Sequence, residues 1–338
     1  MSKRVLITGA TGFVGYHLIE KAIQSGLEVY AAVRKSSSKS HLSEFNIKYI
    51  DLDYSSVENL RSQLEEHQFS YIIHAAGITK AKTKADYNKV NAEFTEHLAV
   101  AAITAGIKLE KFVFVSSLAA LGPLTDLNQE IKEDTPAHPV TNYGTSKLLA
   151  EKYLSEIPGL PLITIRPTAV YGPREKDIFI LFKSISRGLE PHIGSFKQQL
   201  SFIYVKDLAD VIVNSLFVKV NGKQYNVSDG NVYNRYALAE LVKKALKQRT
   251  FKFHLPVPVV SAMASFMDFI YTNSKNTPTL NKEKMAELTA INWACNIDNA
   301  KHDLNYAPKF NLEKGLTDTV KWYKANNWLQ GAMDFPFV

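Results

Sequence analysis

Short apolar runs alternate with stretches of helical periodicity along the first two-thirds of the chain. Several runs are rich in Val, Ile and Phe without alternating polar residues, which is typical of strands covered by helices on both faces. Apolar residues recur at helical spacing from Val14 to Ile23, and Gly26 marks the end of that helix. This rhythm predicts an α/β fold with a doubly wound parallel sheet. The candidate strands are Arg4–Thr8, Glu28–Val33, Lys48–Asp51, Tyr71–His74, Phe112–Ser116 and Leu162–Arg166.

The rhythm changes after Pro167, where strand and helix patterns mix, and the sequence becomes mostly helical from Arg235 onward. We therefore expect a larger domain over residues 1–170, to which residues of about 200–230 return, and a smaller, mixed but mostly helical C-terminal lobe. The lobe would consist of residues 171–200 and 231–338. Further helices are predicted near 86–105, 143–154, 178–187 and 207–216, with strands near 201–204 and 225–227.

The composition is that of an ordinary globular protein, with 338 residues of which 46% are hydrophobic and 22% charged. The net charge of +7 comes from basic residues spread along the chain, which indicates a solvated surface rather than a nucleic-acid site. Cys295 is the only cysteine, so no internal disulfide is expected and a metal–thiolate site has no support. No signal peptide pattern precedes the first strand, and the apolar segment Leu255–Tyr271 is too interrupted to span a bilayer. We expect a cytoplasmic protein with no metal, no nucleic-acid partner and no membrane partner.

Tyr143 and Lys147 lie four residues apart in a predicted helix and therefore share one face of it. An ammonium beside a phenol favours the phenolate, so we expect Lys147 to lower the pKa of Tyr143. Such a phenol can donate a proton to, or accept one from, a carbonyl/alcohol pair near neutral pH. Because Tyr-x-x-x-Lys also occurs on solvated helices, the pair gains its meaning from a second motif far upstream.

That motif is a glycine-rich turn between the first predicted strand and the first helix, Gly9-Ala10-Thr11-Gly12-Phe13-Val14-Gly15. Its glycines allow a backbone to approach a diphosphate closely, and the helix N-terminus points its free N–H groups at the anion. The turn therefore predicts dinucleotide binding.

The cofactor type depends on a position about 20 residues beyond the glycines, where an acidic residue would bind the ribose of NAD. This chain has Val33-Arg34-Lys35 there. Because Arg34 can form a forked pair with a 2′-phosphate, NADP(H) is the preferred cofactor and NAD(H) stays an alternative. Arg34 could instead stack on the adenine or face water.

With both motifs in register, nearly the whole chain resembles the extended short-chain dehydrogenase/reductase family, of NAD-dependent epimerase/dehydratase type and Rossmann-type fold. The resemblance also rests on Asp51-Leu52, His74-Ala75-Ala76-Gly77, Ser116-Ser117 with Gly122, Arg166–Arg174, Ser201–Asp207, and the tail around Trp293, Lys301, Leu304–Tyr306 and Pro308. It implies that the cofactor is bound by Gly9, Thr11, Gly12, Phe13, Val14, Gly15, Arg34, Asp51, Leu52, Ala75, Ala76, Gly77, Ser116, Tyr143, Lys147, Pro167, Thr168 and Val170.

The resemblance also implies roles in catalysis. Ser117 would orient the reacting oxygen, Tyr143 would pass the proton, and Lys147 would hold the nicotinamide ribose. The implied substrate contacts are Thr79, Ser117 and Tyr171. For Ser117 the alternative is a serine that merely caps a loop. His74 is expected to be a packed, hydrogen-bonded histidine, and Asn91 a structural tie between the long helix and the sheet.

The substrate lobe contains the residues that separate the branches of this family. Nucleotide-sugar epimerases and dehydratases usually carry an arginine for the substrate's diphosphate just before the strand near 201–204, where this chain has Leu200. Arg34 and the segment 254–270, which resembles hydroxysteroid dehydrogenases and dihydroflavonol reductases, favour an apolar or small carbonyl substrate. Apolar residues at helical spacing are nevertheless more often core than pocket. The basic loop Lys80–Lys84 is more simply a solvated run than an anion site.

We therefore expect an NADP(H)-dependent oxidoreductase that interconverts a carbonyl and a secondary alcohol by hydride transfer, with Tyr143 as proton donor or acceptor. The alternatives are a nucleotide-sugar 4-epimerase or dehydratase with tightly bound NAD, and a non-catalytic nucleotide-binding sensor. The helices near 86–105 and 143–154 would lie side by side, and in this family such a pair commonly forms a homodimer through a four-helix bundle.

Overall fold

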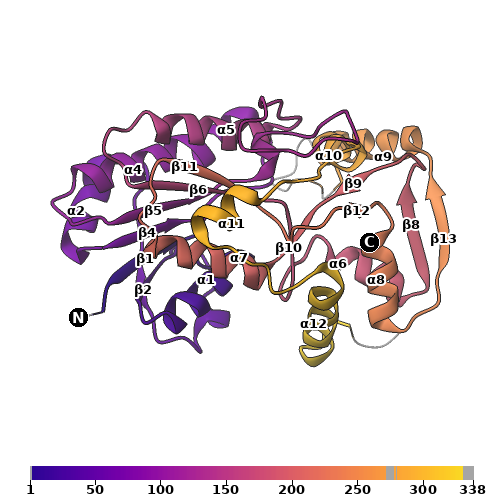
Figure 1. The fold of residues 1–338 in the computed structure, drawn as a ribbon, viewed down its shortest axis with the longest axis horizontal. Helices are drawn as coiled ribbons and strands as arrows, with labels where there is room; N and C mark the ends of the chain where they lie inside the picture. The colour runs from indigo at the N-terminus through magenta and orange to yellow at the C-terminus, as the bar shows by residue number, and fades with distance from the viewer. Residues whose placement is uncertain (1, 272–277, 279, 330–338) are drawn as a thin grey trace.

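A seven-stranded parallel sheet organises the larger part of the computed structural model, which describes residues 2–271, 278 and 280–329 (Figure 1). The strand order is β11-β6-β5-β4-β1-β2-β3, so the chain winds outward in both directions from β1. The strands are β1 (Arg4–Thr8), β2 (Glu28–Ala32), β3 (Lys48–Ile50), β4 (Tyr71–His74), β5 (Lys111–Val115), β6 (Leu162–Pro167) and β11 (Lys223–Val227). These bounds lie within one or two residues of the expected ones, and the predicted doubly wound sheet is confirmed.

Helices cover both faces of this sheet because successive strand residues point to opposite sides. In β1, Val5 and Ile7 belong to one apolar cluster, with α1 (Phe13–Gln24), α7 (Val205–Asn214) and α11 (Asp298–Leu304). Leu6 belongs to the cluster on the other face, with α2 (Val57–His67), α4 (Phe94–Thr104) and α5 (Asn142–Ser155). Late segments thus return to the sheet, since α7 packs against α1 and β11 pairs with β6.

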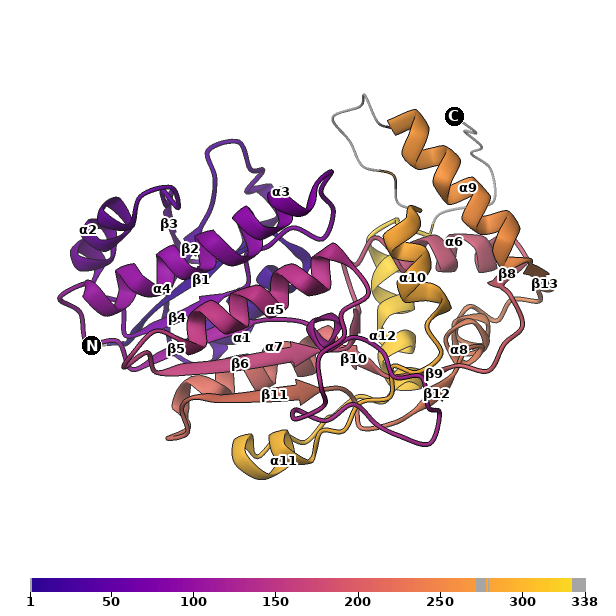
Figure 2. The same cartoon turned by 90° about the horizontal axis from the view of Figure 1, so that it is seen from above.

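A smaller, mixed lobe lies beyond the carboxyl ends of the strands (Figures 1 and 2). Its helices are α6 (Phe179–Ser186), α8 (Ala237–Leu246), α9 (Val257–Ile270), α10 (Lys282–Thr289) and α12 (Leu312–Ala325). Its short strands pair as β7 (Ala169–Tyr171) with β10 (Phe202–Tyr204), β9 (Gln199–Leu200) with β12 (Tyr233–Asn234), and β8 (Leu189–Ile193) with β13 (Phe251–Leu255). A separate aromatic-rich core, including Phe182, Tyr204 and Tyr323, fills this lobe.

The long helix expected over residues 86–105 is interrupted. It consists of α3 (Lys84–Asn88), a π-helical turn (Lys89–Glu93) and α4. Thr83 and Asp86 form a capping box at the start of α3. π-helical turns are frequent at functional sites, and Asn91 lies inside this one. In the part of the chain that the structure describes, no helix is long and apolar enough to cross a bilayer.

Candidate active site

The glycine turn joins β1 to α1 in a shape that excludes side chains. Gly9 has φ +68°, and a Cβ there would stand 2.5 Å from the carbonyl oxygen of Ala75. A Cβ on Gly15 would stand 2.2 Å from the carbonyl oxygen of Gly9. At the start of α1 the N-cap residue is Gly12, so no side chain caps the helix, and the first turn holds no acidic residue. The first N–H groups of α1 are therefore available to an anion.

Thr8 and His74 join the glycine turn to the loop that follows β4. The Thr8 hydroxyl accepts a hydrogen bond from the backbone N–H of Ala76 at 3.0 Å and lies 2.8 Å from Nδ1 of His74. On its other side, Nε2 of His74 lies 2.8 Å from the Thr95 hydroxyl. Burial lowers the pKa of His74 to about 3, so this histidine is neutral. His74 is a packed, hydrogen-bonded residue, as expected.

Lys147 is buried beneath the loop that follows β5. Its ammonium donates to the carbonyl oxygen of Val115 at 2.9 Å and lies 4.8 Å from the centre of the Phe114 ring. Burial lowers the pKa of Lys147 to about 8, an effect opposed by the nearby carboxylate of Glu151. The ammonium is thus held at the carboxyl end of β5, one helical turn from Tyr143.

Tyr143 behaves differently from the expectation drawn from the motif. Burial raises its pKa to about 12, a hydrogen bond from Ser117 opposes this rise, and Glu287 adds to it. The expected lowering of the Tyr143 pKa by Lys147 is therefore wrong for the protein alone. The physical reason is that desolvation outweighs any attraction from an ammonium that is bound to the Val115 carbonyl.

Ser117 and Tyr143 are brought together by the contact between α5 and the short helix η3 (Leu118–Ala120). Ser117 is the N-cap of η3, and its hydroxyl accepts a hydrogen bond from Ala119 N at 3.2 Å. Capping and contact with Tyr143 thus coexist in one serine. Gly144 allows this approach, because a Cβ there would stand 2.2 Å from the carbonyl oxygen of Ala119.

Asn91 ties three elements together at the side of the site. Its side-chain oxygen accepts from Ile78 N at 2.8 Å, and its amide donates to the Ile78 carbonyl and to the Ser146 hydroxyl, each at 2.9 Å. Ser146 in turn donates to the carbonyl oxygen of Tyr143 at 2.7 Å. Asn91 is a structural tie, as expected, but it joins its helix to the loop after β4 and to α5 rather than to a strand of the sheet.

A buried ion pair under α5 was not predicted. Glu151 and Arg166 are each only 3% exposed, and the guanidinium donates to both carboxylate oxygens. The Ser116 hydroxyl also donates to Glu151, so this side chain, expected to contact the cofactor, is already engaged. Glu151 lies one turn beyond Lys147 on α5, and this spacing is the only sequence signal that could have indicated it.

Helix α10 contributes carboxylates that sequence analysis also missed. Glu283 accepts a hydrogen bond from the backbone N–H of Asn142 at 3.0 Å, so it caps the first turn of α5 beside Tyr143. Glu283 and Glu287 also lie near Tyr87, whose pKa is raised to about 12 mainly by burial. Figure 2 shows α10 standing at the start of α5. No local pattern announces a contact between residues 141 positions apart.

The other expected cofactor residues lie at the carboxyl edge of the sheet, after β2, β3, β4 and β6. Arg34 is exposed, and its guanidinium has no partner among the described residues. Asp51 is exposed, whereas Leu52 is buried in the core. Pro167 is the last residue of β6, Thr168 joins β6 to β7, and Val170 lies in β7. The Thr168 hydroxyl is buried without a hydrogen-bond partner.

The two remaining substrate candidates differ in accessibility. Thr79 is exposed, and its carbonyl oxygen accepts a hydrogen bond from the Tyr87 hydroxyl at 3.2 Å. Tyr171 is 1% exposed, packs against Phe202 and Tyr204 in the lobe core, and donates to the Asn311 carbonyl. The side chain of Tyr171 therefore differs from the expectation, because it has no free surface to offer a substrate. Lys80, in the basic loop, pairs with Asp177 at 3.1 Å.

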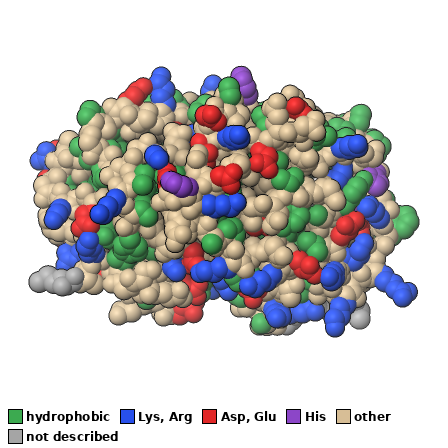
Figure 3. Space-filling model, viewed as in Figure 1, with side chains coloured by type: hydrophobic (Ala, Val, Ile, Leu, Met, Phe, Trp, Pro, Cys, Tyr) green, Lys and Arg blue, Asp and Glu red, His purple; other side chains and the backbone are tan. Residues whose placement is uncertain are grey.

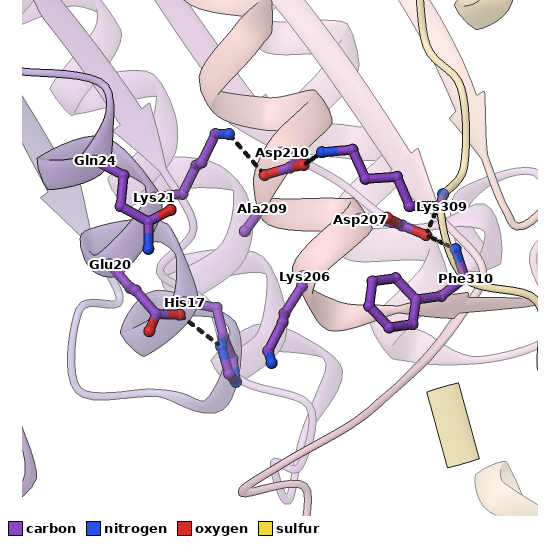
Figure 4. A pocket seen from close by; sticks show the side chains of 10 residues that line it. All are labelled: His17, Glu20, Lys21, Gln24, Lys206, Asp207, Ala209, Asp210, Lys309 and Phe310. Carbon is purple, nitrogen blue, oxygen red and sulfur yellow. Dashed lines mark hydrogen bonds and ion pairs between the residues drawn. The ribbon is translucent and has the colours of Figure 1, made fainter. Parts of the chain in front are cut away.

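A charged cavity of about 310 Å³ lies on the opposite face of the sheet, between α1, α7 and the segment at Lys309-Phe310 (Figure 4). Its charges neutralise one another. Asp210 pairs with Lys21 at 2.9 Å and with Lys309, while Asp207 accepts from the backbone N–H groups of Lys309 and Phe310. This cavity fastens α7 to its neighbours and is separate from Tyr143 and Lys147. No cluster of three metal-ligating side chains occurs among the described residues.

Comparisons with known proteins agree with this geometry. A model of the NAD dependent epimerase/dehydratase family matches residues 5–228. A ceramide reductase from Caulobacter vibrioides is 29% identical over 329 residues, which cover 96% of each chain. A UDP-glucose 4-epimerase from Vibrio cholerae is 28% identical over 335 residues, covering 97% of this chain and 98% of the relative. The crystal structure of the Thermotoga maritima UDP-glucose 4-epimerase with UDP-glucose has the same fold, with a TM-score of 0.77 at 21% identity over 96% of this chain and 99% of the other.

Proposed function

The chain belongs to the NAD dependent epimerase/dehydratase family, and from this premise we propose that it is an NADP(H)-dependent oxidoreductase interconverting a carbonyl and a secondary alcohol. The observation that carries the proposal is the convergence of Tyr143, Ser117 and Lys147 at the carboxyl edge of the sheet, close to an uncapped helix N-terminus. The part of the chain that forms the sheet would bind the cofactor. The lobe, residues 171–200 and 231–338, would receive the substrate.

The residues present fit a dinucleotide. The cradle at Gly9 and Gly15 would be filled by any Cβ, and the N–H groups at the start of α1 suit a diphosphate. The buried, unpartnered hydroxyl of Thr168 is available at the far end of the same edge. When bound, the nicotinamide ring supplies or accepts the hydride.

The protein's part in the reaction is to place the substrate oxygen and move one proton. Ser117 and Tyr143 direct two hydroxyls at the carbonyl oxygen, which fixes its position and stabilises developing negative charge. Tyr143, protonated at neutral pH because burial raises its pKa to about 12, donates its proton as the alcohol forms. Lys147 keeps a positive charge near the ribose side of the site up to a pH of about 8.

The preference for NADP(H) rests on Arg34. Arg34 lies just after β2, and its guanidinium is exposed. Among the described residues no carboxylate pairs with this guanidinium, and the next residue is Lys35. A 2′-phosphate would accept a forked pair of hydrogen bonds from it. Arg34→Ala should raise the Kd for NADPH at least tenfold and leave the Kd for NADH unchanged. Equal affinity of the wild type for the two cofactors would refute the preference.

A second candidate, a nucleotide-sugar 4-epimerase or dehydratase with bound NAD, is supported by the end-to-end similarity to UDP-glucose 4-epimerases. Against it, Leu200 on β9 packs into the lobe core where a diphosphate-binding arginine is expected. Arg235, which follows β12 beside β9, donates instead to the carbonyl oxygens of Ile193 and Phe196. The similarity to a ceramide reductase supports an apolar carbonyl substrate. A non-catalytic sensor would need none of the three groups at Tyr143, Ser117 and Lys147.

The deciding experiment follows NADPH absorbance with a panel of long-chain ketones, small aldehydes and UDP- or dTDP-sugars. We expect NADPH consumption with an apolar ketone, and a loss of at least 100-fold in kcat for Tyr143→Phe with cofactor binding retained. Conversion of a UDP-sugar without net NADPH consumption would establish the epimerase instead. Full activity of Tyr143→Phe would remove the proposed proton donor, and cofactor binding without turnover of any substrate would favour the sensor.

A further inference from the structure

Helix α9 is apolar on two opposite sides, and only one of them is covered. Val260 and Ala264 are buried against Met285 of α10. On the other side, a row at helical spacing is largely exposed, with exposed fractions of 63% for Phe266 and 76% for Phe269. We call this row, made up of Val259, Met263, Phe266, Phe269 and Ile270, the outer face of α9. The expectation that these residues form core is therefore wrong for the outer face.

An exposed row of this kind marks a contact surface. Single exposed apolar residues are normal on proteins, but contiguous apolar patches mark sites for partners or membranes. Within α9, Asp268 is the only charged residue, and it accepts a hydrogen bond from the backbone N–H of Lys282 at 3.2 Å. Figure 2 shows α9 at the outer edge of the lobe, away from the sheet. The outer face is therefore continuous and accessible.

The segment of the lobe that contains α9 is basic, and one of its lysines, Lys282, lies directly beside the end of α9. Residues 231–290 contain nine Lys or Arg and four Asp or Glu, a net charge of +5. Lys247, Arg249 and Lys252 are exposed between α8 and α9, and Lys282 is exposed beside the end of α9. In Figure 3, Lys and Arg side chains gather along the lower right of the molecule, where Figure 1 places α8 and α12, so this cluster lies on the lobe but not beside α9. A second copy of this surface would be repelled by like charge, whereas anionic lipid headgroups would be attracted.

The covered side of α9 is connected through α10 to the candidate active site. Met285 of α10 packs under α9, and two residues earlier Glu283 caps the first turn of α5 beside Tyr143. The pair α9–α10 therefore reaches from the outer edge of the lobe to the catalytic tyrosine.

The sequence led us to expect no membrane partner, but from the exposed apolar row we propose that the outer face of α9 docks on the surface of an anionic phospholipid bilayer. Resting on the proposed reductase function, the inference extends to the substrate, an apolar carbonyl compound taken from that bilayer. The helix would lie in the interface, with Phe266 and Phe269 among the acyl chains and the flanking lysines at the headgroups. Such binding needs one apolar face and no spanning segment.

The test measures co-sedimentation of the full-length protein with vesicles of phosphatidylcholine alone or with about one-third phosphatidylglycerol. Wild type should bind the anionic vesicles at least tenfold more tightly than the neutral ones, and less tightly as salt rises. Phe266→Ser with Phe269→Ser should weaken binding at least about tenfold, because each buried phenylalanine contributes that much. The matched control is Phe217→Ser, which removes a phenylalanine that is 52% exposed in the sheet part of the molecule.

Separate readouts keep the two proposals distinguishable. Vesicle binding needs no turnover, so it can succeed when the reductase assay fails. With both in place, the double variant should reduce a short, water-soluble ketone at the wild-type rate and a vesicle-embedded ketone at least tenfold more slowly. Docking would be overturned by a wild type that ignores both vesicles, or by a double variant that binds as well as wild type. Light scattering tests the remaining alternative. If the wild type is a dimer that binds no vesicle and the double variant is a monomer, a second copy of the chain covers the outer face and docking is overturned.

Discussion

One methyl group added at Gly144 should separate Tyr143 from Ser117. The new Cβ would stand 2.2 Å from the carbonyl oxygen of Ala119 and 3.2 Å from Cβ of Pro139. Ordinary contact begins near 3.4 Å, so α5 and η3 must move apart by about 1 Å in Gly144→Ala. A displacement of that size at reacting groups can cost about 100-fold in rate. Overpacking costs about 1–3 kcal/mol, and the better helix propensity of alanine returns about 1 kcal/mol.

The assay compares kcat for ketone reduction, NADPH affinity by fluorescence, and urea unfolding. We expect Gly144→Ala to lower kcat about 100-fold and the unfolding free energy by no more than about 2 kcal/mol, with NADPH still bound at the glycine turn. Gly106→Ala is the control, because it adds the same methyl where the nearest atom is 3.9 Å away. If Gly144→Ala keeps its kcat within threefold of wild type while Tyr143→Phe is inactive, the contact between α5 and η3 does not set the catalytic geometry.

Four further outcomes are expected. Burial lowers the pKa of Lys147 from 10.5 in the unfolded chain to about 8. Below pH 8 the buried ammonium therefore lowers the free energy of unfolding by up to about 3 kcal/mol, and this loss disappears as the pH rises toward 10.5. Lys147→Met should therefore be more stable than wild type at pH 7 in urea, by up to about 2 kcal/mol after losing one hydrogen bond, and a less stable variant would contradict this. Glu151→Gln should cost about 3–5 kcal/mol of unfolding free energy because it leaves Arg166 buried without its counter-ion, whereas Lys244→Gln, in an exposed pair, should cost less than about 1 kcal/mol. Because the pKa of Tyr143 is raised to about 12, the phenol stays protonated and the reduction rate should be flat between pH 6 and 8. Alcohol oxidation needs the phenolate, so its rate should rise about tenfold per pH unit over the same range. Two flat profiles would exclude Tyr143 as the base. Light scattering should give the mass of a homodimer formed through α4 and α5, and a monomer at working concentration would refute it.

The sheet and the glycine turn were predictable because their signals are local. The apolar runs of β1, β4 and β6 are short and continuous, and Gly9 and Gly15 lie within one turn of chain. The requirement for glycine follows from contacts with backbone atoms of that turn and of the next loop. Sequence periodicity also predicts α5 within one residue at each end, and therefore the shared face of Tyr143 and Lys147.

The electrostatics of the site were not predictable from spacing. Tyr-x-x-x-Lys fixes which face the two residues share, but a pKa depends on how much water each group loses and on which partner it binds. The Val115 carbonyl that holds Lys147 and the carboxylate of Glu283 beside Tyr143 come from elements far away in the chain. Such partners are set by tertiary packing, which a one-dimensional pattern does not contain.

Helix α9 shows the same limit for hydrophobic patterns. Val260 and Ala264 on its covered side and Phe266 and Phe269 on its outer face are all apolar, and they recur with one helical period. A period shows that a helix has apolar faces, but not how many neighbours exist to cover them. In the sheet, helices on both sides bury the central strands β1, β4, β5 and β6, so apolar content and burial coincide there. Among the described residues, Met285 of α10 together with Ile193, Leu255 and Leu280 covers one side of α9, and the apolar residues of its outer face stay exposed.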